Sequence, residues 1–245
     1  MNRFKAVIFD LGSTLIYFDG DWMETLQVAG KELLRSLRMN GLDLAGDFIQ
    51  AFGERMDNYY RERETEFVEY TMMYILNSLL AEKGYAGVTE DVIRSALDAF
   101  FSVTERHWRT DEETIPTLRY LREQGYRLGM ISNAGDDADV QRLVDQAELR
   151  SYFDIILTSA AEGIRKPNPR IFQKVLDYWD LAAGETLMVG DTLGADILGA
   201  RNAGIFSVWL TRWAETPANR AHVETIHPDA AIARLSELPP LMERQ

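Results

Sequence analysis

The sequence predicts an α/β fold, in which a doubly wound parallel sheet is interrupted by an all-helical insertion. Three observations lead to this prediction. An apolar run at residues 6–9 is typical of a buried strand and ends at Asp10. Residues 17–106 then show helical periodicity. From Glu113 onward strand and helix patterns alternate, which favours parallel strands with helices on both faces of the sheet.

The expected elements follow from these periodicities. The insertion contains four amphipathic segments, at residues 22–37, 47–60, 70–83 and 89–107. The alternating part contains helices at 115–124, 140–146, 169–178 and 196–202. Its strands are expected at 127–131, 155–158, 186–189 and 206–210. A short strand near 230–232 and a helix around 235–238 complete the pattern.

Composition indicates a soluble enzyme domain. The chain has 245 residues, 46% of them hydrophobic, so it is long enough for one large core and a smaller insertion. It contains no cysteine, which excludes disulfides and thiol catalysis, and its three histidines are scattered without a zinc pattern. The net charge of -13 argues against nucleic acid and anionic membranes as partners. No apolar stretch approaches the ~20 residues that span a bilayer. We expect a cytoplasmic protein without a signal peptide, either a monomer or a homodimer.

Asp10 is the first candidate functional residue. It would lie at the carboxyl end of a strand, where open α/β sheets place their ligand sites. A carboxylate at this position can act as a nucleophile or as a metal ligand. The motif is not specific when taken alone, because acids are also common in strand-end turns that carry no chemistry.

Three further motifs follow along the chain. Ser132 and Asn133 end an apolar segment and can hydrogen-bond a phosphoryl oxygen, although they are also common turn residues. Lys166 lies beside two prolines on a stiff loop, which suits a positioned charge, whereas most lone lysines are solvated. Asp191 follows another apolar run, and Asp196 comes five residues later. Asp196 is equally suited to the positive end of a helix dipole.

These four motifs, in this order, resemble those of the haloacid dehalogenase superfamily of aspartate-nucleophile hydrolases. The segments 151–154, 169–172 and 196–204 are similar to the family as well, so the resemblance covers nearly the whole chain. It implies a Rossmann-like core formed by residues 1–16 and 107–245. Residues 17–106 would form an inserted helical cap, similar to that of the phosphoglycolate-phosphatase-like branch. Such caps close over the active site, exclude water and select the substrate.

No cap residue is assigned to substrate specificity. Aromatic residues at helical spacing usually serve packing, and the charge-alternating run at 61–64 is typical of a solvated face. The residues considered are Tyr59, Tyr60, Arg61, Arg63, Phe67, Tyr70 and Tyr74.

Gly12 is a departure from the family pattern. Hydrolases of this family usually carry a second aspartate at this position, and a glycine where this chain has Ser13. The second aspartate protonates the leaving group and then activates water, and such general acid–base help contributes about 10²–10⁴ in rate. Its absence puts efficient turnover of phosphate esters in doubt. The metal site is not removed, because the family uses only the backbone carbonyl at this position.

The resemblance implies a magnesium-dependent phosphoric-monoester hydrolase that acts on a small phosphorylated metabolite. Asp10 would attack phosphorus and form an aspartyl-phosphate. Asp10, the Gly12 carbonyl and Asp191 would hold Mg²⁺, which offsets the developing charge. Without an acid at position 12, the chemistry should favour leaving groups that need little protonation.

The remaining motif residues have supporting roles in this reading. Ser132 and the backbone near Asn133 would bind the phosphoryl oxygens. Lys166 would supply a fixed positive charge beside the nucleophile and so serve both catalysis and substrate binding. Asp196 would orient Lys166 or a water molecule on the metal.

Two alternatives remain open. The first is a 2-haloacid dehalogenase, because that branch also lacks the second aspartate and a halide needs no general acid. That branch needs no metal, however, and Asp191 with Asp196 preserves an acidic loop of the metal-binding type. The second is a non-catalytic protein that uses the pocket to bind a ligand or a partner. The retained set of Asp10, Ser132, Lys166 and Asp191 argues against it.

Overall fold

The computed structural model describes residues 3–244, except for the side chains of Tyr60 and of residues 63–66. Residues 1–2 of the expected core segment, Gln245, and the side chains of Tyr60 and Arg63 considered above therefore lie outside the described part. The main sheet has six strands in the order β5-β4-β1-β6-β7-β8, and every neighbouring pair is parallel. The strands are β1 Ala6–Phe9, β4 Arg127–Ser132, β5 Ile155–Thr158, β6 Thr186–Gly190, β7 Phe206–Leu210 and β8 Ala230–Ile232. The predicted α/β class with a doubly wound parallel sheet is confirmed.

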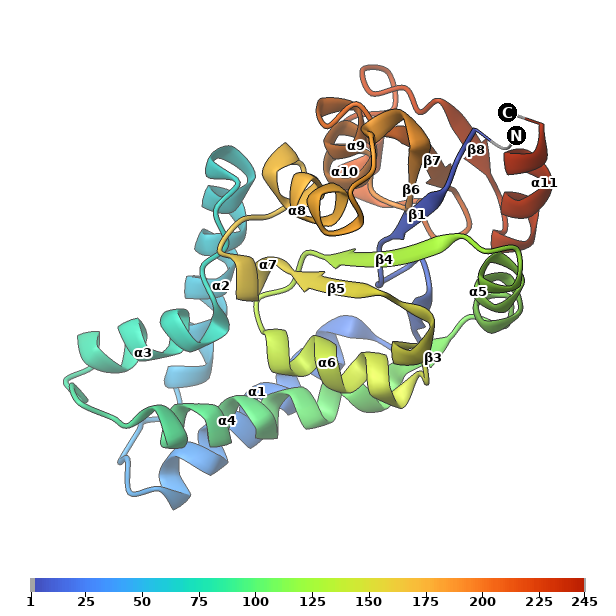
Figure 1. The fold of residues 1–245 in the computed structure, drawn as a ribbon. Helices are drawn as coiled ribbons and strands as arrows, with labels where there is room; N and C mark the ends of the chain where they lie inside the picture. Colours follow the sequence, from blue (N-terminus) through green and yellow to red (C-terminus); the bar gives the residue numbers. More distant parts are fainter. Residues whose placement is uncertain (1–2, 245) are drawn as a thin grey trace.

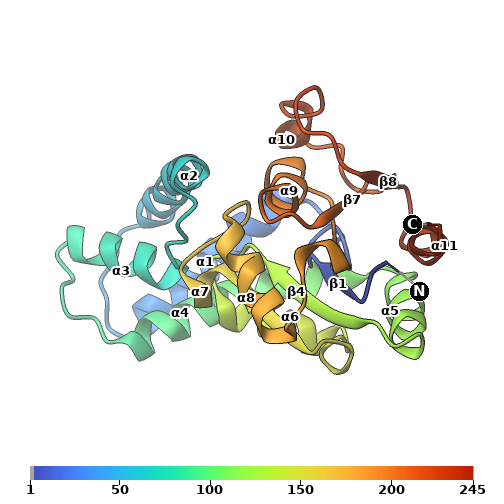
Figure 2. The same cartoon turned by 45° about the horizontal axis from the view of Figure 1, so that its top comes forward.

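Helices cover both faces of this sheet (Figures 1 and 2). The central strand β1 shows why, since Val7 and Phe9 belong to one hydrophobic cluster while Ala6 and Ile8 belong to another. This division follows from the alternation of side chains along a strand. The first cluster includes residues of α5 Thr114–Glu123, α6 Asp137–Gln146 and α11 Leu238–Glu243. The second includes residues of α8 Pro169–Trp179 and α9 Leu198–Asn202.

The inserted segment forms four helices with a hydrophobic cluster of their own. The helices are α1 Trp22–Met39, α2 Phe48–Glu66, α3 Met72–Glu82 and α4 Glu90–Thr104. The buried members of this cluster all lie between Ala29 and Phe101. In Figure 1 these helices lie beside the carboxyl end of β4 and β5, with α4 running alongside α6. The fold is thus a Rossmann-like core with a helical cap.

A two-stranded antiparallel ribbon joins the cap to the core and was not expected. It pairs β2 Ile16–Phe18 with β3 Trp108–Thr110, and Tyr17 lies opposite Arg109. Its two short strands are separated in the sequence by the whole insertion, so no local pattern indicates that they pair. The expected domain limits at residues 16 and 107 fall next to this ribbon, and the division into two domains stays a prediction.

Other differences concern short elements and helix ends. The helix expected over 89–107 ends at Thr104 and is followed by a 3₁₀ turn. The helix expected from residue 196 begins as a π-helical turn at Leu193–Ile197. Two four-residue helices, α7 Ser159–Glu162 and α10 Pro217–Arg220, have no periodic signal of their own. Short 3₁₀ turns also occur at Glu105–His107, Arg150–Tyr152, Ala183–Glu185 and Leu235–Glu237.

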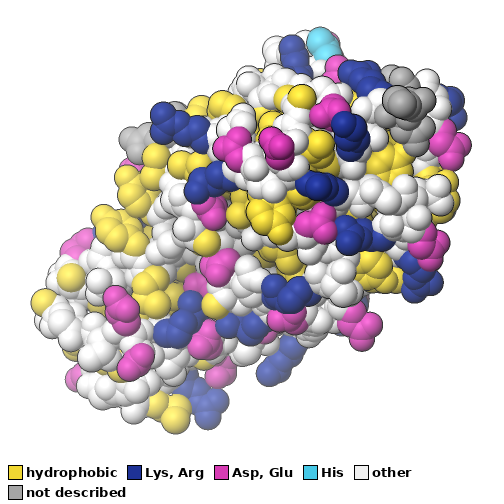
Figure 3. Space-filling model, in the orientation of Figure 1, with side chains coloured by type: hydrophobic (Ala, Val, Ile, Leu, Met, Phe, Trp, Pro, Cys, Tyr) yellow, Lys and Arg dark blue, Asp and Glu magenta, His cyan; other side chains and the backbone are white. Residues whose placement is uncertain are grey.

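The surface fits a globular chain with mixed charges. On the face drawn in Figure 3, acidic and basic side chains are interspersed and apolar groups are scattered between them. Among residues 3–244, no helix combines the length and the apolar character that crossing a membrane requires.

Candidate active site

Three central strands of the sheet bring candidate residues to one edge. Asp10 directly follows β1, Ser132 ends β4, and Asp191 directly follows β6. Strands β4 and β6 flank β1, so these three positions are neighbours at the carboxyl edge of the sheet. The Asp10 amide extends the pairing by donating a hydrogen bond to the Val189 carbonyl oxygen at 2.9 Å.

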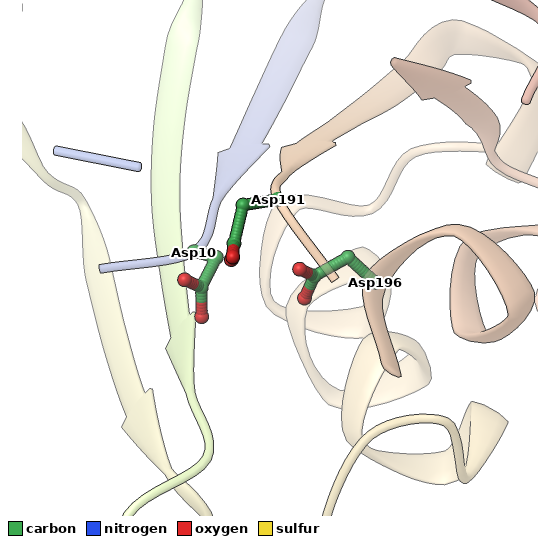
Figure 4. Close-up of side chains that lie close together, drawn as sticks. All are labelled: Asp10, Asp191 and Asp196. Carbon is green, nitrogen blue, oxygen red and sulfur yellow. The ribbon is translucent and has the colours of Figure 1, made fainter. Parts of the chain in front are cut away.

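Three carboxylates converge at this edge (Figure 4). Asp10, Asp191 and Asp196 are all buried, and one oxygen of each lies within 4.8 Å of the others. Gly190 makes this approach possible, because a Cβ atom there would lie 2.3 Å from the Asp196 carboxylate. The Thr192 amide donates to Asp196 Oδ2 at 2.9 Å and fixes the carboxylate in place. Gly190 is therefore required for packing, while Asp191, the next residue, supplies an acid.

Lys166 lies at the centre of the cluster. Its Nζ is 2.6 Å from Asp10 Oδ1 and 2.7 Å from Asp196 Oδ1, and it donates to the Ile131 carbonyl oxygen at 2.7 Å. The side chain is 1% exposed. Burial favours the neutral amine, but Asp10 and Asp196 outweigh it and raise the pKa of Lys166. The structure therefore places a permanent positive charge beside Asp10.

One lysine does not neutralise three carboxylates. Burial raises the pKa of Asp10 to about 6, with Lys166 acting against this shift and Asp196 adding to it. Burial, followed by repulsion from Asp10 and Asp196, raises the pKa of Asp191 well above its ordinary value. Ionisation of all three carboxyls would leave more negative charge than Lys166 compensates, and a bound cation would offset this charge.

Asn133 and Ser132 have different surroundings. The Asn133 side chain accepts a hydrogen bond from the Lys166 amide and donates one to the Lys166 carbonyl oxygen, both at 2.9 Å. This reciprocal pair fixes the lysine loop to the end of β4, so the amide is engaged with Lys166. Ser132 is buried and lines the same cavity as Asp10. Phosphoryl binding by Ser132 and by the backbone at Asn133 stays a prediction.

Gly12 lies beneath an aromatic ring that the sequence did not associate with the site. A Cβ atom at position 12 would lie 3.4 Å from Cη2 of Trp108, the first residue of β3. Ser13 follows with a φ of 58°, a left-handed conformation that glycine adopts more readily. Nothing polar from position 12 enters the cavity except the backbone.

Asn219 is a second residue that sequence reasoning missed. Its Nδ2 donates to the Asp191 carbonyl oxygen at 2.8 Å, and its Oδ1 accepts from the Leu193 amide at 2.8 Å. Trp209 Nε1 donates to the same Asp191 oxygen at 2.8 Å. Asn219 is buried in the short helix α10, far from the motif in sequence. Only its tertiary position reveals that it holds the acidic loop.

The cap and the core are pinned together next to Lys166. The buried Glu69 carboxylate accepts hydrogen bonds from the hydroxyls of Tyr59 at 2.5 Å and Ser159 at 2.8 Å. It also lies 3.2 Å from the Arg165 guanidinium, which precedes Lys166 in the chain. The cap therefore contacts the core directly beside Lys166, and Tyr59 serves this contact, as the packing interpretation expects.

A cavity of about 870 Å³ lies between cap and core and contains the acidic cluster. Its lining includes Gly12, Ser132, Lys166, Trp108 and, on α6, Asp139. Burial and then repulsion from Glu105 raise the pKa of Asp139 to about 8, so this carboxyl holds a proton at neutral pH. The arrangement combines a buried carboxylate with a fixed cation at its side, which suits nucleophilic attack on an electrophilic substrate that the cap screens from water.

Comparison with known proteins agrees with this geometry. The model of the family of haloacid dehalogenase-like hydrolases matches residues 4–204. A glyceraldehyde 3-phosphate phosphatase from Pyrococcus furiosus is 29% identical over 100% of this chain and 95% of its own. A 2-haloacid dehalogenase from Pseudomonas syringae has a similar structure, with a TM-score of 0.67 and 26% identity over 98% of this chain and 99% of that one.

A magnesium-bound structure of the HAD-hydrolase YfnB from Bacillus subtilis is also similar in fold, with a TM-score of 0.61 and 22% identity over 98% of this chain and 99% of that one. The family model covers most of the chain, and the Rossmann-like sheet with its helical cap agrees with the fold of these structures. The chain is an enzyme that belongs to the haloacid dehalogenase-like hydrolase family.

Proposed function

We propose that the protein is a magnesium-dependent phosphatase that works through an aspartyl-phosphate on Asp10. The observation that carries the proposal is the position of the Asp10 carboxylate, which lies 2.6 Å from Lys166 Nζ and within reach of Asp191 and Asp196. The phosphatase from Pyrococcus furiosus, similar over the whole chain, supports a phosphate ester as substrate. Residues 1–16 and 107–245 act as the catalytic core and residues 17–106 as the cap.

The residues present fit a magnesium ion. Their donors are hard carboxylate oxygens, which Mg²⁺ prefers, and ionisation of all three carboxyls would leave negative charge that Lys166 alone does not offset. Asp10, Asp191 and the Gly12 carbonyl would hold the ion. When bound, the ion offsets the charge that develops on the phosphoryl oxygens.

The protein's own groups account for the rest of the reaction. Asp10 forms a bond to phosphorus while the bond from phosphorus to the leaving oxygen breaks, and water later releases phosphate from Asp10. Lys166 holds the phosphoryl group against the nucleophile by its charge, and Asp196 orients Lys166 through their 2.7 Å ion pair. Ser132 and the backbone at Asn133 bind the phosphoryl oxygens. The cap limits access of water to the site.

A panel of substrates tests this proposal. Purified protein is incubated with phosphorylated metabolites that include glyceraldehyde 3-phosphate, and with 2-chloropropionate, each with magnesium and with chelator. We expect phosphate release that depends on magnesium and no chloride release. Chloride release in chelator, without phosphate release from any ester, would contradict the proposal.

The second candidate is a 2-haloacid dehalogenase, which one observation favours. Position 12 offers no acid and lies under the indole of Trp108, and a halide leaves without being protonated. The dehalogenase from Pseudomonas syringae shares this fold over nearly the whole chain. The charge imbalance of Asp10, Asp191 and Asp196 favours the metal-dependent phosphatase instead, and the panel above separates the two.

Substitution of Gly12 tests the account of the missing acid. The parent should hydrolyse acetyl phosphate far faster than glycerol 3-phosphate, because acetate leaves without a proton and an alkoxide does not. General acid help is typically worth about 10²–10⁴ in rate, but Trp108 crowds the new side chain and limits the gain. We therefore expect Gly12→Asp to raise the glycerol 3-phosphate rate at least about tenfold. The decisive measurement is the ratio of the two kcat values.

Gly12→Asn is the matched control, because it has the same size without a carboxyl and should leave the ratio near that of the parent. A parent that turns over both esters equally fast must have another acid. Asp139 is then the group to test, because it lines the cavity and keeps a proton at neutral pH.

Asn219 is expected to act as a positioning residue for the metal loop. Asn219→Ala removes the two hydrogen bonds that hold Asp191 and Leu193. Supporting hydrogen bonds of this kind are typically worth about 10–100-fold in metal affinity, so the magnesium concentration for half-maximal activity should rise by about tenfold or more. Activity is measured over a magnesium series, and saturating magnesium should restore much of kcat.

The control is Asn40→Ala, which removes a similar amide-to-carbonyl bond, of 2.9 Å, at the end of α1. An unchanged magnesium dependence in Asn219→Ala, in a protein that unfolds at the parent's temperature, would contradict this role.

A further inference from the structure

The part of the cavity that the cap contributes is apolar. Trp22 and Leu26 of α1, Met56 of α2, and Phe100 and Phe101 of α4 all line it. Among the described cap residues on this lining, Thr104 alone has a polar side chain, and its hydroxyl already donates to the Phe101 carbonyl oxygen at 3.1 Å. The surface that faces the group attached to phosphorus therefore offers contact area and few hydrogen-bonding partners.

The apolar wall continues down to the catalytic turn. The ring of Phe18 makes an edge-to-face contact with Trp22 at 4.8 Å between centroids, and a second one with Trp108 at 5.5 Å. Trp108 in turn covers Gly12. Trp22 and Trp108 both line the cavity, and the ring of Phe18 connects them behind this lining.

The lysine and the arginine on the lining are already paired. Lys166 is bound to Asp10 and Asp196, and the Arg165 guanidinium lies 3.2 Å from Glu69. On the lining that the structure describes, no other lysine or arginine is present. A second phosphate or a carboxylate on the substrate would therefore find no lysine or arginine that is not already engaged, and His222 is the other basic side chain on the described lining.

We propose that the leaving group of the natural substrate is apolar and aromatic, so that the substrate is an aryl phosphate; this rests on the proposed phosphatase function. Hydroxyl groups of a polyol would lose water against the part of the lining that the cap contributes without gaining partners there, whereas an aromatic ring gains contact area. The departure of an aryl leaving group also agrees with the absence of an acid at position 12. The bond from Asp10 to phosphorus forms, the bond from phosphorus to the aryl oxygen breaks, and the phenolate leaves with the electron pair and takes its proton from water. No acid at position 12 is required.

Four esters separate recognition from reactivity. 4-Nitrophenyl phosphate and acetyl phosphate have leaving groups that need no proton, but only the first is aromatic. Benzyl phosphate and glyceraldehyde 3-phosphate both release an alkoxide, and again only the first is aromatic. Within each pair we expect KM to be about 10–100-fold lower for the aromatic ester, the effect of burying one apolar side chain of that size. We expect kcat to be higher for 4-nitrophenyl phosphate and acetyl phosphate, whose leaving groups need no proton, than for the two esters that release an alkoxide.

Trp22 provides a variant outside the buried core of the cap. Its side chain is 46% exposed and is absent from the cap's hydrophobic cluster, so Trp22→Ser should fold. We expect the ratio of KM values, acetyl phosphate over 4-nitrophenyl phosphate, to fall about tenfold, because one aromatic contact is lost. Met23→Ser is the control, since Met23 is the next residue on α1, is exposed, and does not line the cavity.

Binding without turnover distinguishes this inference from the function on which it rests. With magnesium present, calorimetry should show benzylphosphonate binding about 10–100-fold more tightly than methylphosphonate. If that preference is found and no ester is hydrolysed, the phosphatase function fails while the aromatic site stands. If esters are hydrolysed but aromatic and polar members of each pair have equal KM, the inference is overturned while the function stands. If neither the binding preference nor ester hydrolysis is found, both the inference and the phosphatase function are overturned.

Discussion

Asp10→Asn will abolish hydrolysis while leaving the fold intact. An amide cannot attack phosphorus. Where several catalytic residues act together, removing the nucleophile alone reduces kcat by about 10⁴-fold or more. The change keeps the size of the side chain at the end of β1, where the backbone is fixed by its bond to Val189. Lys166 keeps Asp196 and the Ile131 carbonyl as partners, so the buried ammonium is not left unpaired.

Two measurements check this expectation. The turnover of an ester that the parent hydrolyses gives the loss in kcat, and mass spectrometry of the quenched reaction should find phosphate on Asp10 in the parent only. Asp154→Asn is the control, because it neutralises a carboxylate at the surface, 2.8 Å from Arg122 and outside the cavity. Undiminished turnover by Asp10→Asn would rule out the assigned mechanism.

The fold could be predicted from the sequence because its long elements carry strong periodic signals. The continuous apolar run of β1 indicates a strand that is buried on both faces, and the helical pattern of α8 fixes the face that packs against the core. The β2–β3 ribbon could not be predicted, since its pairing joins Phe18 to Trp108 across the whole insertion. The π-helical turn before α9 was missed for a similar reason, because it serves the approach of Asp196 to Gly190.

The candidate site shows the same division. Residues next to strand ends, such as Asp10 and Asp191, could be identified because parallel strands bring their carboxyl ends together. Trp108 and Asn219 could not, because nothing in their local sequence distinguishes them from packing residues. Their importance depends on tertiary contacts, with Gly12 in one case and with the Asp191 loop in the other. The pairing of the Asn133 amide with Lys166 likewise required the structure.

Asp191→Ala should lose most activity, and it should also lose the stabilisation that magnesium gives the parent. A ligand that binds only the folded state stabilises it by about 2.7 kcal/mol at 100 times its Kd, so magnesium should raise the free energy of unfolding of the parent by about this amount and that of the variant much less. Urea unfolding with magnesium and with chelator measures this difference independently of any substrate. Asp229→Ala is the control, since Asp229 contacts Ser207 away from the cavity.

The same experiment tests whether the acidic cluster serves to bind a cation. Burial and repulsion by Asp10 and Asp196 raise the pKa of Asp191, so its charge is unfavourable near neutral pH when no cation is present. In chelator, Asp191→Ala should therefore be at least as stable as the parent, although a buried side chain has been shortened. With magnesium the order should reverse, because the carboxylate then binds the ion. A parent that keeps full activity in chelator and gains no stability from magnesium would show that these carboxylates are not a metal site, and the dehalogenase interpretation would replace the phosphatase.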